Sequence, residues 1–520
     1  MAISDIFKRK KVQKRRVMPI VPRSYVAAGV NRLFADFGVS DSSADGELRT
    51  SLPIMRARSR ELSRNNSYVK RYLGLLTKNV VGKKGITYQS KALNSDGTMD
   101  TGGNDLVESA FRSWGRLGNC TVDGKMTFCD VQKMAVECEA RDGEVFILKH
   151  FGPQFKDGVA LQFIDADRID HDVNRRLENG NEIRMGVELD AFKKPVRYHV
   201  LQDHPGDAGF QAKAGQKKYI QVPAERMIHI FKAERPGQTR GVPRTAPTMS
   251  AIKQLDGFKE AAIVAARVGA SKMGFFTSNS GDDFNADEYD GQTPVMNAES
   301  GTFTQLPAGM DFKSFDPGYP TGEFDPFHKA VLKSIASGLE IGYTSLANDA
   351  EATSYSSIRQ VALDDRDFYS DQQEFFIEHL VRPIFECWLE YYLSFGNSPM
   401  PLSRFEKFAN AAEFRGRSWN WVDPLKEMNA AVTGLHSGIQ SLQHVAAQYG
   451  MDAEELLSQI KKDKELMVQF GVDYALEPYN VPKAPEVVPD EDEDDAEDKS
   501  NADNSEDELN RAIITALTVV

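Results

Sequence analysis

Apolar residues recur at helical spacing over the first part of the chain. Between Thr50 and Gly82 arginines and lysines occupy the face opposite these apolar positions, which are Leu62, Tyr68, Leu73, Leu75, Leu76 and Val80. Gly82 stands where such a helix would stop. The sequence therefore predicts helical structure over residues 50–82, with further helices over 104–116 and 127–143.

The pattern changes after Gly143 to short runs rich in β-branched and aromatic residues. The runs "EVFILKHF", "VALQFIDADRI" and "RMIHIFKA" are bounded by Gly, Pro, Asp and Asn. Residues 143–232 are therefore expected to form an antiparallel sheet.

Helical spacing returns after this β-rich region. Helices are expected over 246–276, 323–340 and 357–393, and a turn-rich segment over 277–320 separates the first two. The last helix has one broad apolar face, and Pro383 should kink or break it. Its apolar residues are Ile358, Val361, Phe368, Phe375, Phe376 and Leu380. A further helical block covers residues 421–471, and no structure is assigned from 477 onwards.

One polar stretch interrupts this helical part. "SLANDAEATSYSSIRQ", residues 345–360, has no bulky apolar residue between Leu346 and Tyr355. It is rich in small hydroxyl side chains, which a packed core would not select. We therefore expect residues 345–360 to form a loop.

Charge is concentrated at the two ends of the chain. The net charge of the 520 residues is -13. Residues 490–508 carry twelve Asp and Glu against one lysine, and residues 1–23 carry eight Lys and Arg against one Asp. The rest of the chain is close to neutral, and both ends are expected to lack stable structure.

Composition indicates a soluble intracellular protein. The basic start is not followed by the apolar run of a secretory signal, and no segment approaches the roughly 18 consecutive apolar residues that span a membrane. We expect reduced thiols, because the cysteines are too few for a disulfide scaffold and fit no zinc spacing: Cys120, Cys129, Cys138 and Cys387.

No catalytic constellation emerges from the motifs. The stretch "GLLTKNVVGKKGIT" lacks the glycine spacing of a phosphate loop, and the serines at 354–357 have no neighbouring histidine or nucleophile-elbow glycines. "FIDADRID" supplies Asp165, Asp167 and Asp170, which could hold Mg²⁺ for phosphoryl or nuclease chemistry. A strand that ends in a turn explains the same residues, so we expect no catalytic site, metal or cofactor.

Five motifs in order resemble the lambda-type portal proteins of tailed bacteriophages. The resemblance extends over residues 50–470, and the pieces "GQTRGVP" and "SYSS" are its most specific parts. The motifs are "RNNSYVKRYLGLLTKNVVGKKGI", "IDADRI", "IHIFKAERPGQTRGVP", "SGLEIGYTSLANDAEATSYSSIRQ" and "WNWVDPLKEMNAA". Neither the basic start nor the acidic end is covered.

This resemblance implies an α+β subunit that assembles into a closed ring of about twelve copies. Such a ring lies at one capsid vertex of the virion, is assembled in the host cytoplasm, and passes double-stranded DNA through its channel during packaging and ejection. The implied partners are the terminase large subunit, the major capsid and scaffold proteins, and the head-completion and tail connector proteins. No membrane is involved, and the packaging motor would be a partner.

The family order also assigns a region to each part of the chain. The expected regions are a basic disordered leader (1–25), a mixed α/β wing (26–242), a first stem helix (243–276), a clip (277–320), a second stem helix (321–339), a tunnel loop (340–357), a long wing helix (358–395), a helical wing and crown-side region (396–476) and an acidic disordered tail (477–520).

In this frame the polar stretch would project into the DNA tunnel. Small polar groups would touch the duplex without gripping it, and carboxylates would repel its phosphates. The residues concerned are Asn348, Asp349, Glu351, Ser354, Tyr355, Ser356 and Ser357. A second motif would serve structure or the subunit interface through Gly237, Gln238, Thr239, Arg240, Gly241 and Pro243. Whether Arg240 belongs to an interface or to an internal salt bridge stays open.

Two other functions remain as alternatives. A metal-dependent nuclease or phosphoryl-transfer enzyme would use Asp165 and Asp167, and its cleavage would need Mg²⁺. A plain nucleic-acid-binding scaffold would bind duplex DNA through residues 8–16. The near-neutral body of the chain counts against the scaffold, because non-specific DNA binders are normally basic over a whole face.

Overall fold

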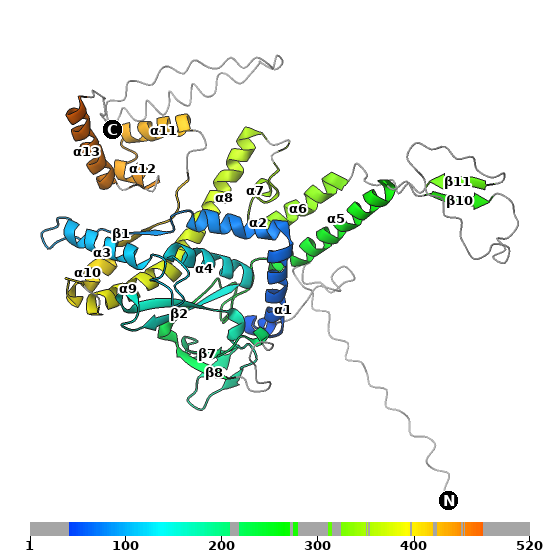
Figure 1. Ribbon diagram of the computed structural model, residues 1–520, viewed down its shortest axis with the longest axis horizontal. Coiled ribbons are helices and arrows are strands. Elements are labelled where there is room, and N and C mark those ends of the chain that lie inside the picture. Colours follow the sequence, from blue (N-terminus) through cyan, green and yellow to red (C-terminus); the bar gives the residue numbers. More distant parts are fainter. Residues whose placement is uncertain are drawn as a thin grey trace, which may run out of the picture. The chain divides into compact units, whose positions relative to one another are not determined.

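The computed structural model divides the chain into two compact units, Met1–Arg417 and Ser418–Val520 (Figure 1). It describes residues 41–207, 218–270, 274–278, 310–314, 324–349, 351, 354–395, 398–419, 424–448, 451 and 453–471. The expected leader at 1–25 and tail at 477–520 lie outside these residues.

The helical stretch after Thr50 consists of two helices rather than one. Helix α1 (Ala44–Asn65) and helix α2 (Ser67–Leu76) meet at Asn66, whose Oδ1 accepts from the amides of Tyr68 and Val69. An amide side chain that bonds the backbone in this way favours a helix start over a helix interior. A π-helical turn (Thr77–Val81) extends α2 to Gly82, where a φ of 75° ends the helix at the predicted residue.

The next two helices lie where the periodicity placed them. Helix α3 spans Thr101–Trp114 and helix α4 spans Phe128–Asp142. Thr127 and Asp130 form a reciprocal capping box at the start of α4, which satisfies two of its free amides.

The β-rich region is antiparallel, as predicted, but it forms two sheets. The first has the order β3 (Val159–Ile164), β2 (Glu144–Phe151) and β9 (Met227–Phe231). The second has the order β4 (Arg175–Arg176), β5 (Glu182–Arg184), β6 (Val187–Leu189), β7 (Pro195–Leu201) and β8 (Tyr219–Pro223). A shared core joins them, in which Phe146 and Ile164 of the first sheet pack with Val187, Tyr198 and Val222 of the second.

A small sheet brings together distant parts of the first unit. Strand β1 (Thr87–Ser90) pairs antiparallel with β12 (Ala412–Arg415), more than 300 residues away along the chain. Its Tyr88 stacks on Phe385 with ring centres 4.1 Å apart. The sequence did not predict this pair, since two four-residue strands give little periodicity and the partners are remote.

Both segments that were expected to form the stem contain a helix, with shorter bounds than predicted. Helix α5 spans Met249–Ala270 and helix α6 spans Phe324–Gly338. The range 243–276 is too long for the first helix, because a strand, β10 (Gly274–Ser278), begins before it ends. This strand pairs antiparallel with β11 (Met310–Ser314), and the rest of the expected clip lies outside the described residues.

The polar stretch is shorter than expected because helices enter it from both sides. Helix α7 (Tyr343–Ala347) occupies its first part, and helix α8 (Tyr355–Phe376) begins three residues earlier than the expected 358. Ser354 explains this early start, since its hydroxyl accepts from the amide of Ser357 and caps the helix. Residues 340–357 are therefore not one continuous loop.

The long helix continues through Pro383 instead of breaking there. A π-helical turn (Ile377–Val381) joins α8 to helix α9 (Arg382–Phe395). Proline lacks the amide that an α-helix would bond to the fourth residue back, and a locally widened turn accommodates this loss. The short helix α10 (Phe405–Asn410) follows in the same unit.

The second unit is helical, as the periodicity of residues 421–471 predicted. Its described helices are α11 (Pro424–His436), α12 (Leu442–Gln448) and α13 (Ala453–Phe470). Across the described parts of both units, every helix is too short or too polar to cross a membrane.

Candidate functional site

A carboxylate at the start of β2 is the centre of a buried ion cluster. Glu144 is fully buried, and its oxygens accept from Arg240 Nε at 2.8 Å and from Arg240 Nη2 at 2.7 Å. Arg56 of α1 donates to the same carboxylate through Nη2 at 2.5 Å. Two buried arginines thus share one carboxylate, which ties α1 and the loop before α5 to the sheet.

The remaining donors of Arg240 are also satisfied inside the subunit. Its Nη1 donates to the carbonyls of Ile169 at 3.1 Å and Met185 at 2.6 Å, and its Nη2 donates to that of Ala166 at 3.2 Å. The side chain is 0% exposed. Of the two roles that the sequence left open for Arg240, the structure shows the internal salt bridge.

The residues before Arg240 fix the loop that carries it. Thr239 donates to Asp45 of α1 from its amide and its hydroxyl, each at 2.8 Å. Gln238 donates to the Arg240 carbonyl at 2.8 Å, and Gly237 adopts a φ of 78° that glycine tolerates best. The motif therefore holds a buried arginine in one position.

Gly241 is required by a close approach between two backbones. A Cβ on Gly241 would lie 1.9 Å from the carbonyl oxygen of Gly143, and a Cβ on Gly143 would lie 2.6 Å from the nitrogen of Pro243. The end of α4 and the start of the segment leading to α5 therefore touch without side chains between them. Pro243 follows at once, and its carbonyl accepts from the amide of Ala246 at 2.9 Å.

The ion cluster shifts the pKa values of Glu144 and His229. Burial opposes the charge on Glu144, but Arg240, the hydrogen bond from His229 and Arg56 outweigh it, so the pKa of this carboxyl lies well below its usual range. Burial lowers the pKa of His229 below its ordinary value despite the neighbouring carboxylate. His229 is therefore neutral, and its Nε2 donates to Glu144 Oε2 at 3.0 Å.

The aspartates of "FIDADRID" are held by arginines of α1. Arg60 pairs with Asp165 Oδ1 at 2.9 Å and with Asp167 Oδ2 at 2.6 Å, while Arg56 pairs with Asp167 Oδ1 at 2.7 Å. Although burial opposes its charge, the carboxylates around Arg60 raise its pKa. The two carboxylates considered for metal binding are therefore already neutralised by guanidinium groups.

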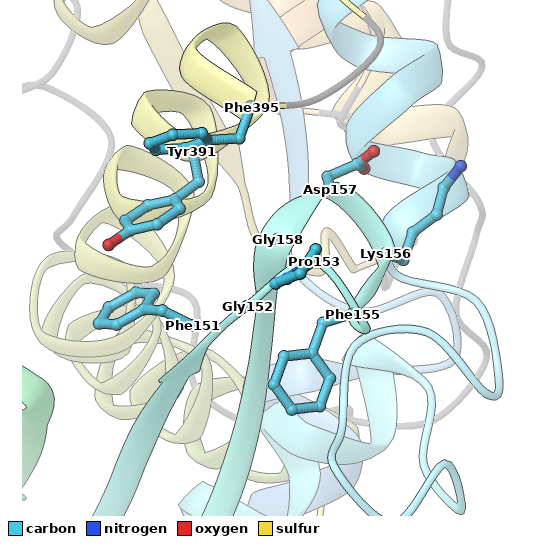
Figure 2. A pocket seen from close by; sticks show the side chains of 9 residues that line it. All are labelled: Phe151, Gly152, Pro153, Phe155, Lys156, Asp157, Gly158, Tyr391 and Phe395. Atoms are coloured by element: carbon cyan, nitrogen blue, oxygen red, sulfur yellow. The ribbon is translucent and has the colours of Figure 1, made fainter.

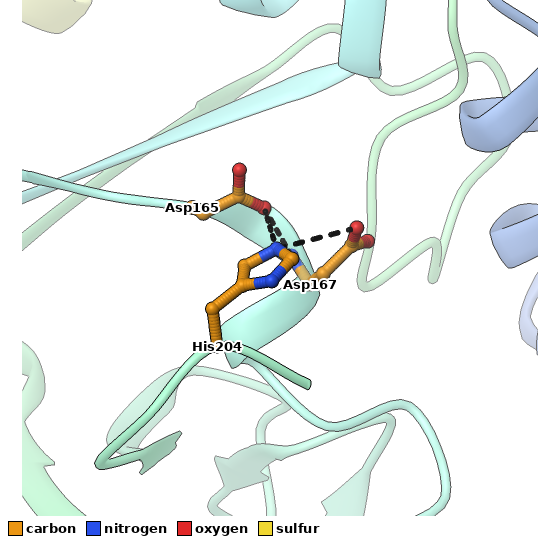
Figure 3. A group of neighbouring side chains, drawn as sticks. All are labelled: Asp165, Asp167 and His204. Atoms are coloured by element: carbon orange, nitrogen blue, oxygen red, sulfur yellow. Dashed lines mark hydrogen bonds and ion pairs between the residues drawn. The ribbon is translucent and has the colours of Figure 1, made fainter. Parts of the chain in front are cut away.

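Figure 3 shows the third member of this group, His204, which the sequence did not single out. Its Nε2 lies 3.7 Å from Asp165 Oδ1 and 3.9 Å from Asp167 Oδ2. Such a set could surround a cation, yet Arg60 and Arg56 take up the carboxylate oxygens that a cation would need. Asp170, the third aspartate of the motif, accepts instead from the Tyr219 hydroxyl at 2.7 Å.

The polar stretch between α6 and α8 is anchored at its start by α2. Arg71 donates to the Ser345 carbonyl at 2.6 Å and to Asn348 Oδ1 at 3.2 Å. Asn348 itself has a φ of 57° and ends α7. The backbone thus turns sharply here, at a residue type that tolerates this conformation.

Asp349 and Glu351 lie beside a lysine of α6. Lys329 Nζ is 3.7 Å from each of these carboxylates and 2.9 Å from Asp325. Asp349 also accepts from the Tyr343 hydroxyl at 2.8 Å, and this bond leads the causes that lower its pKa. Three carboxylates, those of Asp325, Asp349 and Glu351, therefore share the ammonium group of Lys329.

The serines of the stretch form a network at the start of α8. The Ser354 hydroxyl lies 3.0 Å from that of Ser356 and 2.8 Å from that of Ser357, and all three side chains are exposed. Helix α8 itself begins at Tyr355. Ser354 thus caps the helix, and all three hydroxyls remain open to solvent.

Sequence reasoning missed the partners of these segments. Glu144 holds Arg240, Arg56 and Arg60 hold the aspartates at 165 and 167, and Arg71 and Lys329 contact the polar stretch. Each lies far along the chain from the residue it contacts, so no local spacing could reveal the pairing.

A surface pocket of about 750 Å³ lies between the β2–β3 turn and the end of α9 (Figure 2). Phe151 and Tyr391 stack at its wall with ring centres 4.5 Å apart, and Phe395 is 78% exposed beside them. Among the described residues that line it, Lys156 and Asp157 are charged.

The comparisons with known proteins all point to one family. The family model described as phage portal protein, lambda family, matches residues 31–373. The "Probable portal protein" of Halomonas phage phiHAP-1 is 33% identical over 505 residues, covering 94% of this chain and 96% of that relative. "Portal protein B" of Escherichia phage lambda is 23% identical and covers 80% of this chain and 84% of its own.

The solved structures are less similar to this chain than the relatives found by sequence. A chain of the virion of a native gene transfer agent particle has a TM-score of 0.41 at 12% identity, covering 76% of this chain and 93% of its own. An HK97 family phage portal protein from Corynebacterium diphtheriae has a TM-score of 0.31 at 11% identity, covering 71% and 97%. The assignment therefore rests on the sequence matches, which show that this chain belongs to the lambda family of phage portal proteins, the connectors of the phage particle.

Proposed function

We propose that about twelve copies of this chain close into a ring whose channel passes double-stranded DNA into and out of the capsid. Membership of the portal family is the observation that carries this proposal. Closing a ring requires two different patches on each copy, because every copy meets two neighbours. Exposed apolar residues on the stem helices suit such contacts: Ile263 is 59%, Val264 50% and Phe327 53% exposed.

The proposal assigns a place in the ring to each region. Residues 26–242 and the long helix would form the wing, α5 and α6 the stem, and the segment between these helices the clip. The helical block after Trp419 would belong to the crown side. The buried ion cluster suits the wing assignment, because it ties α1 and the loop before α5 to the sheet.

The polar stretch would line the channel. Exposed hydroxyls at Ser354, Ser356 and Ser357 offer weak and interchangeable hydrogen bonds to a sliding duplex. The surplus of carboxylates around Lys329, which includes Asp349 and Glu351, would repel phosphates and keep the DNA centred. Tight phosphate contacts here would instead have to be broken at every step.

The chain would act without turnover of its own. The terminase large subunit would supply the motor, capsid and scaffold proteins would surround the ring in the host cytoplasm, and head-completion and tail proteins would close it later. The arginine pairing of Asp165 and Asp167 supports a structural role for the residues that a nuclease would use.

Packaging in the host tests the proposal. Cells that make the phage with the D349K/E351K variant should assemble particles containing the chain but protect less DNA from nuclease, since cations would hold the phosphates. The control variant D105K changes an exposed carboxylate on α3 and should package normally. Particles that contain no copies of the chain, or package normally without it, would contradict the proposed function.

A further inference from the structure

The break between α1 and α2 is held by one asparagine whose side chain makes contacts on two sides. Asn66 is buried, and its extended backbone interrupts the helix. Its Oδ1 accepts from the amides of Tyr68 and Val69, each at 3.0 Å. Because the oxygen must face these two donors, the amide nitrogen has to point the other way.

The amide nitrogen of Asn66 points at α5. Its Nδ2 lies 3.0 Å from Asp256 Oδ1 and 2.9 Å from Asp256 Oδ2, so it donates to a carboxylate in the first half of that helix. Hydrogen bonds to a charged group are stronger than those between neutral groups. One side chain therefore caps α2 and binds α5 at the same time.

The first turn of α2 also contacts both α5 and α6. Lys259 of α5 lies over the ring of Tyr68, with its Nζ 4.7 Å from the ring centre and 3.6 Å from Asp256 Oδ1. The Tyr68 hydroxyl lies 3.4 Å from His328 Nε2 on α6. The Asn66 corner, meaning Asn66 and Tyr68, thus contacts both helices.

Helices α5 and α6 run side by side and are packed against each other (Figure 1). Phe258 of α5 stacks on Phe324 of α6 with ring centres 5.4 Å apart, and it meets Phe327 edge-on at 5.1 Å. A Cβ on Gly338, at the end of α6, would lie 2.5 Å from Thr248 Cγ2, just before α5. A change in the direction of α5 should therefore carry α6 with it.

We infer that the Asn66 corner is a brace that sets the direction of α5 and α6 relative to the rest of the first unit, with Asn66 as its positioning residue. The inference goes beyond the proposed function, because it concerns the shape of one copy and not the closure of a ring. The two roles of Asn66 can be separated. N66D keeps an oxygen that caps α2, but it sets a second carboxylate against Asp256.

A distance measured within one chain tests the brace. Spin labels attached through azido amino acids at the exposed positions of Asp105 on α3 and Glu260 on α5 leave the native cysteines unlabelled. Labelled chains are diluted in an excess of unlabelled chains, so that only distances within one copy are recorded. The unaltered chain should give one narrow distance distribution, and N66D should broaden or shift it. N66D/D256N should restore it, since donor and acceptor then exchange places.

The matched control is E61Q, which removes another link between α1 and α5. Glu61 and Lys253 lie 3.8 Å apart with side chains 47% and 72% exposed, so this variant should leave the distribution unchanged. An N66D distribution equal to that of the unaltered chain would overturn the brace, as would a change that D256N does not reverse.

A second variant keeps the inference testable where N66D does not fold. D256A removes only the acceptor on α5, leaves the cap of α2 intact, and should also broaden or shift the distribution. An unchanged distribution in D256A would overturn the brace. Because each distance is recorded within one copy, such a failure would leave the proposed ring standing.

Discussion

Glu144 illustrates how one buried charge can organise a domain. It receives hydrogen bonds from α1, from the loop before α5 and from His229 on β9, all around a carboxylate without solvent contact. Burying such charges is costly unless each is paired, so the arrangement tolerates little change. The sequence marked Arg240 as important but could not supply its partner, because hydrogen bonding across 96 residues leaves no local pattern.

Removing Arg240 should therefore destabilise the first unit strongly. R240M removes one of the two guanidinium groups that neutralise the buried Glu144 carboxylate. We expect a loss of about 3–5 kcal/mol in the free energy of unfolding. R235M in the same loop removes an ion pair with Glu47 whose side chains are both 50% exposed, and should cost less than about 1 kcal/mol. Denaturant midpoints followed by the fluorescence of the buried Trp114 and Trp388 measure the difference, and equal midpoints would contradict this account.

The lowered pKa of His229 predicts a pH dependence. In the unfolded chain this imidazole takes up a proton below about pH 6.5, whereas in the folded chain it stays neutral to lower pH. The unfolded state then binds more protons, so stability falls as the pH drops from 7.5 to 5.5. The H229Q variant keeps a donor for Glu144 but cannot titrate, and its midpoint should fall less over this window. Identical slopes would refute the assignment.

At the scale of elements, most helices and the antiparallel β-region were predictable because apolar periodicity and caps are local signals. The capped helix α4 lies as expected, and Gly82 and Gly143 end their helices. The β1–β12 pair and the division into two sheets were not predictable, since strand pairing is settled by remote contacts. The early start of α8 was missed because Ser354 was interpreted as part of the loop and not as a cap.

The close backbone contact between Gly241 and Gly143 predicts that replacing Gly241 destabilises the protein more than replacing Gly237 in the same motif. G241A places a Cβ against the Gly143 carbonyl, and we expect insoluble or unfolded protein. G237A meets no atom within 4 Å and only strains a left-handed backbone, at a cost of about 1–2 kcal/mol. Soluble yield and denaturant midpoints of both variants distinguish them. A G241A protein as stable as G237A would contradict the close backbone contact.

At the scale of the whole molecule, the family and the exposed apolar surface point to the same conclusion. Helices α5, α6 and α13 expose large apolar side chains that a chain working alone would tend to bury. Five motifs in order allowed the sequence to suggest a portal, and the lambda-family match over residues 31–373 confirmed the family. The residues that meet a neighbour could not be named from sequence, because they depend on which faces the folded chain leaves uncovered.

The mass of the assembled protein in solution, measured together with negative-stain images of the same sample, tests the central claim most directly. Twelve copies of the 58.0 kDa chain would give about 700 kDa, with a central hole wide enough for duplex DNA. Scaffold protein and high chain concentration should promote closure where the chain alone does not close. A chain that stays monomeric or dimeric under all these conditions would contradict the ring.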